Sequence, residues 1–206
     1  SDSQYTLTPM SFFFLPPVPA LPTEKKYPRQ ELVELCLQRH VSNLCGGVFA
    51  LPYGVRQIIH EYSFEKINQM NIHEAVRLWI EDRAMAEMRY GHISYWDVSG
   101  VQNMDKLFEG NAKFNEDISR WDVRNVASMA SMFRQCEAFN ARISGWDVSQ
   151  VRNMSHMFAG AISFNQSLSG WNVSQVTDMK SMFNGATSFN QPLSAWDVSA
   201  VKDMNW

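Results

Sequence analysis

Four aspartates recur at matching places along this chain, and their type and spacing make them the first candidates for chemistry. Each of them follows a tryptophan: Asp97, Asp122, Asp147 and Asp197. A row of carboxylates could hold calcium, which takes oxygen ligands. The matching position 172 is asparagine, however, and an aspartate shortly before a serine is ordinarily a turn or cap residue. We therefore assign the aspartates a structural role and predict no metal and no other cofactor.

No other set of side chains has the spacing of a catalytic motif. His60 and His73 each precede a glutamate, but neither has the second histidine four residues on that a metalloprotease helix requires. Three cysteines without a C-x-x-C pair indicate neither a disulfide framework nor a zinc site: Cys36, Cys45 and Cys136. Because no nucleophile triad and no glycine-rich phosphate loop occurs either, we expect a protein that is not an enzyme.

The elements that position the aspartates belong to an internal repeat. Five tryptophans follow one another at intervals of 25 residues without an insertion: Trp96, Trp121, Trp146, Trp171 and Trp196. A fixed period of this kind is typical of stacked-repeat proteins, in which each copy contacts only its neighbours. Four copies are complete, and the fifth stops at residue 206. The sequence therefore predicts a solenoid.

Two hydrophobic periods occur inside each copy. Val101, Met104 and Phe108 follow the spacing of a helix face, and Ser99 stands where a hydroxyl could cap its first turn. Ahead of them, the tryptophan and a valine alternate with a polar residue, as in a short strand. We expect an α/β solenoid, leucine-rich-repeat-like, with one short strand and one short helix per 25-residue repeat. Its core would contain the tryptophans and one phenylalanine per copy: Phe108, Phe133, Phe158 and Phe183.

A polar column accompanies this core. An asparagine follows a phenylalanine in each complete copy: Asn115, Asn140, Asn165 and Asn190. Beside an inward-facing ring, such a side chain needs hydrogen-bond partners. We expect the asparagines to lie inside the stack and to form a ladder with the backbone of neighbouring copies. A row of ligand-binding amides is the alternative.

The repeated motif resembles that of a known family. It reads Trp-Asp-Val-Ser-x-Val-x-x-Met-x-x-Met-Phe, followed by Phe-Asn-x-x-Leu, and is similar to the BspA-like (DUF285) leucine-rich-repeat surface proteins over residues 91–206. Copy two departs most, with Arg124 in place of serine and Gln135-Cys136 near the glycine step. The resemblance implies a leucine-rich-repeat-like fold without catalytic residues. It also implies a role in adhesion or interaction, on a surface or within an assembly.

Three segments make up the predicted domain organisation: an extended proline-rich arm (1–29), a helical region (30–91) and the repeat solenoid (92–206). In the helical region, an apolar stripe predicts one helix from Ile72 to Arg89. Asn71 and Glu74 have the spacing of a capping box at its start. Because this helix directly precedes the first copy, we expect it to cover the hydrophobic end of the stack.

The arm contains an apolar run followed by prolines: Phe12, Phe13, Phe14 and Leu15. It lacks the basic start and the unbroken apolar stretch of a signal peptide, and it is too short to cross a membrane. We predict no membrane span, and the compartment stays open. Because four exposed apolar residues in a row are unusual in water, we expect the phenylalanines to contact a groove on this chain or on a partner.

Composition narrows the class of partner. The chain has 206 residues, 19% of them charged, a net charge of −3 and no basic patch, so it lacks the footprint of a nucleic-acid partner. We expect a protein or glycan partner, or a place in a larger assembly. Tyr95 and Arg120 stand at variable positions and are of the types that anchor interfaces. The end of the stack at Trp206 is the competing contact site.

A second function stays open beside this one. The stretch Leu51–Tyr62 weakly resembles the start of an F-box, a motif that is known to occur together with leucine-rich repeats. An intracellular F-box-like adaptor that recruits substrates is therefore the alternative hypothesis. Binding to a Skp1-like subunit would distinguish the two.

Overall fold

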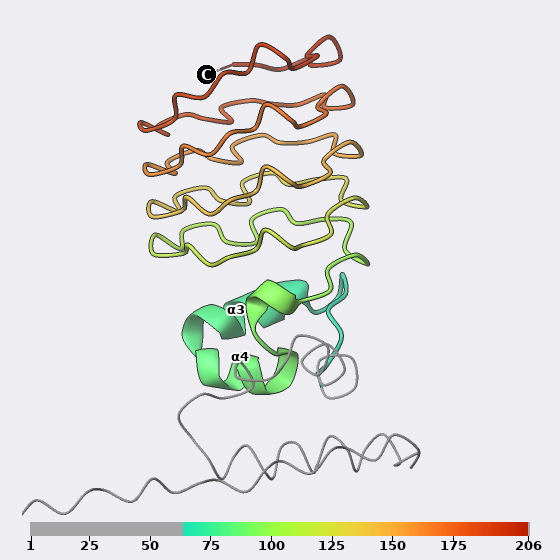
Figure 1. Cartoon of the computed structure of the whole chain (residues 1–206), viewed down its shortest axis with the longest axis vertical. Coiled ribbons are helices and arrows are strands. Elements are labelled where there is room, and N and C mark those ends of the chain that lie inside the picture. The colour runs from blue at the N-terminus through green and yellow to red at the C-terminus, as the bar shows by residue number, and fades with distance from the viewer. Residues whose placement is uncertain (1–63, 206) are drawn as a thin grey trace, which may run out of the picture.

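The structure is a computed structural model and describes residues 64–205. It begins with a short segment and two helices, α3 (Ile72–Glu81) and α4 (Arg83–Tyr90), followed by a single 3-10 turn, η2 (Ile93–Tyr95). From Trp96 onward the chain winds in successive turns that lie one above another, with the helices below the first of them (Figure 1). We call each turn a copy and the whole set the stack.

Neighbouring copies are joined in a constant register of 25 residues. One residue per copy forms a parallel bridge with its equivalent in the next: Asn103 with Ser128, Ser128 with Asn153, Asn153 with Asp178, and Asp178 with Asp203. Beyond the first bridge, alternate backbone N–H groups of copy one donate to carbonyl groups of copy two. They are Met104 to Ser128 at 2.9 Å, Lys106 to Ala130 at 2.8 Å, Phe108 to Met132 at 2.9 Å and Gly110 to Arg134 at 2.8 Å.

The expected helix and strand of each copy do not form in residues 96–205. The helix fails because one residue near the middle of each copy adopts a left-handed conformation, with φ between 50° and 59°: Lys106, Ser131, His156 and Ser181. A helix of L-residues does not tolerate that conformation. Alternate N–H groups of this stretch bond to the next copy, and those between them bond to the carbonyl three residues back, so no run of helical bonds forms. The strand is reduced to one bridging residue per copy.

Aromatic side chains fill the middle of the stack in continuous columns. The ring centroids of Phe108 and Phe133 lie 5.5 Å apart, those of Phe133 and Phe158 5.7 Å, and those of Phe158 and Phe183 5.6 Å. The first four tryptophans of the repeat are buried. Phe183 and Trp196, in the last copies, are only partly buried, which departs from the expected uniform core.

The polar groups of each copy also meet the next one. Four tryptophan indole N–H groups donate to a carbonyl 28 residues earlier: Trp121 to Ile93, Trp146 to Ile118, Trp171 to Ile143 and Trp196 to Leu168. The asparagine side chains accept the backbone N–H of the following asparagine: Asn115 from Asn140, Asn140 from Asn165, and Asn165 from Asn190. The expectation that these asparagines are buried is wrong, because the column lies at an exposed edge.

The helical unit differs from its prediction at two points. The single helix expected from Ile72 to Arg89 is broken at Asp82, whose carboxylate accepts the N–H of Met85 at 3.1 Å and so starts α4. The capping box is also wrong, because the Asn71 side chain does not cap α3 and instead donates to the Lys66 carbonyl at 2.9 Å. Glu74 pairs with Arg89 of α4 at 2.7 Å.

Two side chains connect the helical unit to the stack. The Trp79 ring of α3 meets Trp96 edge-on, with centroids 5.9 Å apart and planes at 82°. The Gln69 amide accepts from the N–H groups of Gln102 and Asn103, at 3.0 and 2.8 Å, and donates to the Asn103 carbonyl at 3.1 Å. These bonds occupy the backbone edge of copy one that no earlier copy covers.

Several sequence predictions lie outside the described residues. They concern the arm with Phe12, Phe13 and Phe14, the F-box-like stretch 51–62, Cys36 and Cys45, and Trp206.

Candidate protein-interaction surface

The strongest candidate site lies where α4 meets the first copy. We call it the junction surface: Arg83, His92, Tyr95, Glu116 and Arg120. The Arg120 guanidinium carbon lies 5.7 Å from the centroid of the Tyr95 ring, a cation–π contact between residues 25 apart. Tyr95 is half-buried and Arg120 is exposed. Tyr95 and Arg120, the two nominated partner contacts that lie within the described residues, are therefore neighbours on one surface.

Arg83 joins the two parts of the junction. Its guanidinium bonds to Glu116 of the first copy at 2.9 Å and to Glu87 of its own helix at 3.1 Å. The same group stacks over the Trp79 ring, 4.4 Å from its centroid. Because these groups are partly exposed, each ion pair contributes little to stability. Their main effect is to fix the position of Arg83 relative to the stack.

His92 lies between these charges and the aromatic core. Its ring meets Trp79 edge-on at 4.9 Å, and its Nε2 is 3.1 Å from Nη2 of Arg83. Its Nδ1 lies 2.8 Å from the Ser94 hydroxyl. Burial, and then the positive charge of Arg83, lower the pKa of His92 below its usual value. The backbone N–H of Ser94 also donates to Nδ1, at 3.3 Å. Because a neutral ring carries a proton on one nitrogen, it cannot accept at Nδ1 and at Nε2 together.

The aspartate row is occupied by local bonds rather than poised for a ligand. Asp97 accepts the backbone N–H of Ser99 at 3.0 Å and its hydroxyl at 2.6 Å, so Ser99 is a donor here and not the predicted cap. Asp122 pairs with Arg124 at 2.8 Å. Within residues 64–205 no group of three or more histidine, cysteine or acidic side chains could hold a metal ion.

Cys136 also carries no chemistry in its present environment. It is fully buried, and its thiol donates to the Phe108 carbonyl at 3.0 Å. Burial raises the pKa of this thiol to about 12, so the nucleophilic thiolate is suppressed at neutral pH.

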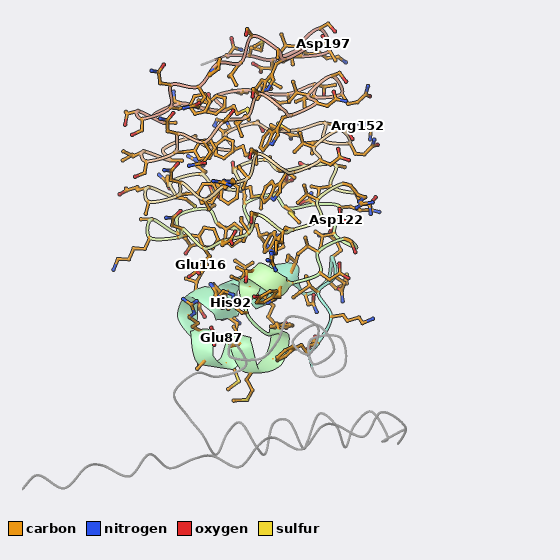
Figure 2. All side chains as sticks on the ribbon, viewed as in Figure 1. Glu87, His92, Glu116, Asp122, Arg152 and Asp197 are labelled. Carbon is orange, nitrogen blue, oxygen red and sulfur yellow. The ribbon has the colours of Figure 1, made fainter. Side chains whose placement is uncertain are left out.

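Figure 2 separates the two sides of the molecule. Glu87, His92 and Glu116 are labelled at the helices and just above them, whereas Asp122, Arg152 and Asp197 are labelled along the right-hand side of the stack. Sequence reasoning found Tyr95 and Arg120 because they interrupt a repeating pattern. It missed Arg83, His92 and Glu116, because the contact between Arg83 and Glu116 spans 33 residues and leaves no local signal.

Comparison with known proteins now adds to this geometry. A family model described as "Mycoplasma protein of unknown function, DUF285" matches residues 77–176 and again residues 132–206. The chain belongs to the DUF285 family. The resemblance read from the repeat is thereby confirmed, and the matched region of this DUF285 chain includes the whole junction surface. No curated protein and no solved structure matches the chain.

The family itself is described only as being of unknown function, so membership does not assign an activity. Among the described residues, no helix has the length and apolar character needed to cross a membrane. What the DUF285 chain can do therefore has to be argued from its surfaces.

Proposed function

We propose that this protein is a non-enzymatic binding module of the leucine-rich-repeat-like solenoid class, and that a protein partner docks on the junction surface. The single observation that carries the proposal is the Tyr95–Arg120 contact, which places two interface-type side chains together on the surface. In the other copies the residue before the tryptophan is glycine or alanine: Gly145, Gly170 and Ala195. The stack therefore offers this pair only at its helical end.

Buried tryptophans fix the backbone next to Tyr95 and Arg120. Tyr95 precedes Trp96 and Arg120 precedes Trp121, and the two indoles stack with centroids 6.2 Å apart. Both tryptophans are buried, and Trp121 is tied to the Ile93 carbonyl at 2.9 Å. Side chains held in this way lose little conformational entropy when a partner docks on them. Such pre-organisation favours binding over a flexible surface of the same composition.

The charges around the pair favour a protein partner. Arg83 and Arg120 lie beside Glu116 and Asp117, so the surface carries both signs. A nucleic-acid site would require a continuous basic patch, which this surface lacks. Mixed charges around an aromatic anchor match the polar rim and central anchor of protein interfaces. The alternative, an F-box adaptor, would depend on residues 51–62, which lie outside the described part of the chain.

The proposal is tested by comparing two variants of the 206-residue chain in quantitative capture from a native extract. Tyr95→Ala with Arg120→Ala should reduce the captured partner at least 10-fold, because hot-spot truncations cost about 2 kcal/mol or more. The matched control is Arg152→Ala with Ile162→Ala, which removes an exposed arginine and an exposed apolar residue elsewhere on the stack. Both variants should keep the parent melting temperature within about 2 °C. Equal capture by the two variants would refute the junction as the docking site.

A further inference from the structure

One side of α4 is apolar although it is exposed. Ala86 and Tyr90 lie on the opposite side of the helix and are buried. Met85 and Met88 are 46% and 72% exposed, and Ala84 is exposed beside them. We call Ala84, Met85 and Met88 the outer face of α4. In Figure 1, α4 is labelled below α3, on the side of the helical unit away from the stack.

The neighbouring helix shows how the helical unit otherwise meets water. The exposed positions of α3 are polar, with Ile80 as the exception: His73, Glu74, Arg77 and Glu81. Single exposed apolar side chains such as Ile80 or Met70 are ordinary in proteins. A helix side that is apolar along its length is instead the pattern of a packed face. The outer face of α4 therefore has the composition of a contact surface.

The chain enters the described structure beside this face. The N–H of Glu65 donates to the Arg89 carbonyl at 2.9 Å, and the Arg89 guanidinium bonds to the Glu65 carboxylate at 2.6 Å. Arg89 directly follows Met88. Tyr62 precedes Glu65 by three residues, so chain length alone keeps it within about 11 Å of Glu65. The residues that lead into Phe64 are therefore tethered at the last turn of α4.

Those preceding residues carry an apolar stripe of their own. It has the i, i+3, i+4, i+7 spacing of one helix side: Val55, Ile58, Ile59 and Tyr62. The positions between them are glycine, polar or charged: Gly54, Arg56, Gln57, His60 and Glu61. Pro52, before the stripe, suits the first turn of a helix. The sequence thus predicts an amphipathic helix whose apolar side, like that of α4, needs a partner.

We propose that the stretch Leu51–Tyr62 packs this stripe on the outer face of α4 of the same chain. An amphipathic helix is stabilised chiefly by burying its apolar side against another element. The short connection to Glu65 gives the stretch an effective concentration on the order of millimolar at α4. A second copy of the chain, or another protein, would have to compete with that concentration for the same face.

This packing has a consequence for function. Leu51–Tyr62 is the stretch that resembles an F-box, and a stripe buried on α4 is not available to a Skp1-like subunit. The packing would therefore leave an F-box-like adaptor without its binding helix. It does not depend on the junction surface, so Tyr95→Ala with Arg120→Ala should leave it unchanged.

Methyl NMR of the 206-residue chain tests the contact directly. With the methionine ε and isoleucine δ1 methyl groups labelled, Met85 and Met88 should show nuclear Overhauser cross-peaks to Ile58 and Ile59. Met70, which is 92% exposed, should show none and is the internal control. In a mixture of chains labelled only at methionine with chains labelled only at isoleucine, the cross-peaks should vanish.

Two NMR outcomes would overturn the inference. Cross-peaks that persist in the mixture would assign the outer face of α4 to a second copy of the chain. Absence of cross-peaks from the fully labelled chain would mean that the face is open to solvent or to another protein.

Charge substitutions give an independent measurement. Met85→Glu with Met88→Glu should lower the melting temperature by about 4–8 °C, because it places two carboxylates against an apolar stripe. Met70→Glu, the matched control, should change it by less than about 2 °C. Ile59→Glu should also lower it, and combining it with the α4 pair should add little, since both disrupt one contact. Unchanged melting of the α4 pair, or fully additive losses, would contradict the proposed packing.

Discussion

The first and the last described copies share one repeat pattern but differ in what covers them among residues 64–205. At the helical end, Trp79 closes the tryptophan column and Gln69 occupies the backbone edge of copy one. At the other end, Phe183 and Trp196 are only partly buried, and the N–H of Gly185 meets no described group. At the helical end, the stack is therefore closed by residues that do not belong to the repeat.

Gln69 shows how a single side chain can end a ladder. Its amide has the same donor and acceptor groups as a peptide unit, and it bonds to Gln102 and Asn103 where a preceding copy would have contributed backbone. Uncovered edges are sites of unwanted pairing, so proteins commonly block them.

The largest expected effect compares how much a phenylalanine contributes to the free energy of unfolding in the middle of the column and in the last complete copy. Phe158→Ala, in the middle of the column, should lower the free energy of unfolding by about 3–5 kcal/mol, because it leaves a cavity between two neighbouring rings. Phe183→Ala, in the last complete copy, should cost only about half as much, since the ring is already partly exposed. Urea unfolding followed by tryptophan fluorescence measures both. Equal losses would show that the core around Phe183 is as tightly packed as the core around Phe158.

Glycines at equivalent positions provide the next comparison. Gly110 and Gly185 have φ of 77° and 72°, so alanine at either position is strained by about 1–2 kcal/mol. Only Gly110 also donates to the next copy, at 2.8 Å to the Arg134 carbonyl. Alanine keeps this N–H, but the bond ties residue 110 to the next copy, so its backbone cannot shift to relieve the strain as residue 185 can. Gly110→Ala should therefore cost about 2 kcal/mol and Gly185→Ala about 1 kcal/mol less.

Gly100→Ala is the control for that pair, because a methyl group there meets nothing within 4 Å and the backbone is not left-handed. It should be neutral. A Gly185→Ala variant as unstable as Gly110→Ala would mean that the bond to Arg134 does not restrict how the backbone of residue 110 relaxes.

Removing the Gln69 amide from the backbone edge of copy one is expected to have a smaller effect on stability. Gln69→Ala deletes three hydrogen bonds at an exposed edge, which should reduce stability by about 1.5 kcal/mol. Gln150→Ala, an exposed glutamine whose side chain makes no hydrogen bond in the described structure, should change it by less than about 0.5 kcal/mol. Hydrogen exchange should also accelerate at the amides of Gln102 and Asn103. If exchange there is unchanged, Gln69 does not block the edge.

The register of the stack was readable from the sequence because it depends on residues that repeat without insertion. The 25-residue spacing of the tryptophans reappears in the parallel bridges, such as Asn103 with Ser128. The conformation within a copy was not readable. An apolar stripe at helical spacing also arises when turns place the same residues inward, and Lys106 or His156 gives no glycine signal for its positive φ.

The asparagine column shows a related limit. Its spacing indicated a ladder, and the side chains do bond to the next copy, but nothing in the spacing distinguishes an exposed edge from the interior. The junction surface was half predictable for a different reason. Tyr95 and Arg120 deviate from a repeat and so attract notice, whereas Arg83 and His92 act through contacts with distant residues.

The smallest expected effect concerns pH at the helical end alone. His92 has a lowered pKa in the folded chain, through burial and then Arg83, whereas Glu87, Glu116 and Asp117 act in the opposite direction. As the pH falls through about 6.5, the unfolded chain therefore takes up a proton that the folded chain does not. Stability should decline from that pH downward until the folded pKa of His92 is reached. Below it, this residue adds no further loss.

The measurement is the urea midpoint at pH 7.5 and pH 5.5 for three proteins. His92→Gln should lose less stability than the parent over this range, because glutamine does not titrate. His73→Gln, an exposed histidine on α3, should behave like the parent. The lowered pKa of Asp117, held by the bonds from Ser119, causes losses only below about pH 4, outside the range compared. Exchange protection, corrected for the slower intrinsic exchange in acid, should also fall at the Trp96 amide, which lies at the junction, but not at the Met179 amide in copy four. A uniform fall in protection at both ends would show that the stack responds as one unit and that His92 does not control the helical end.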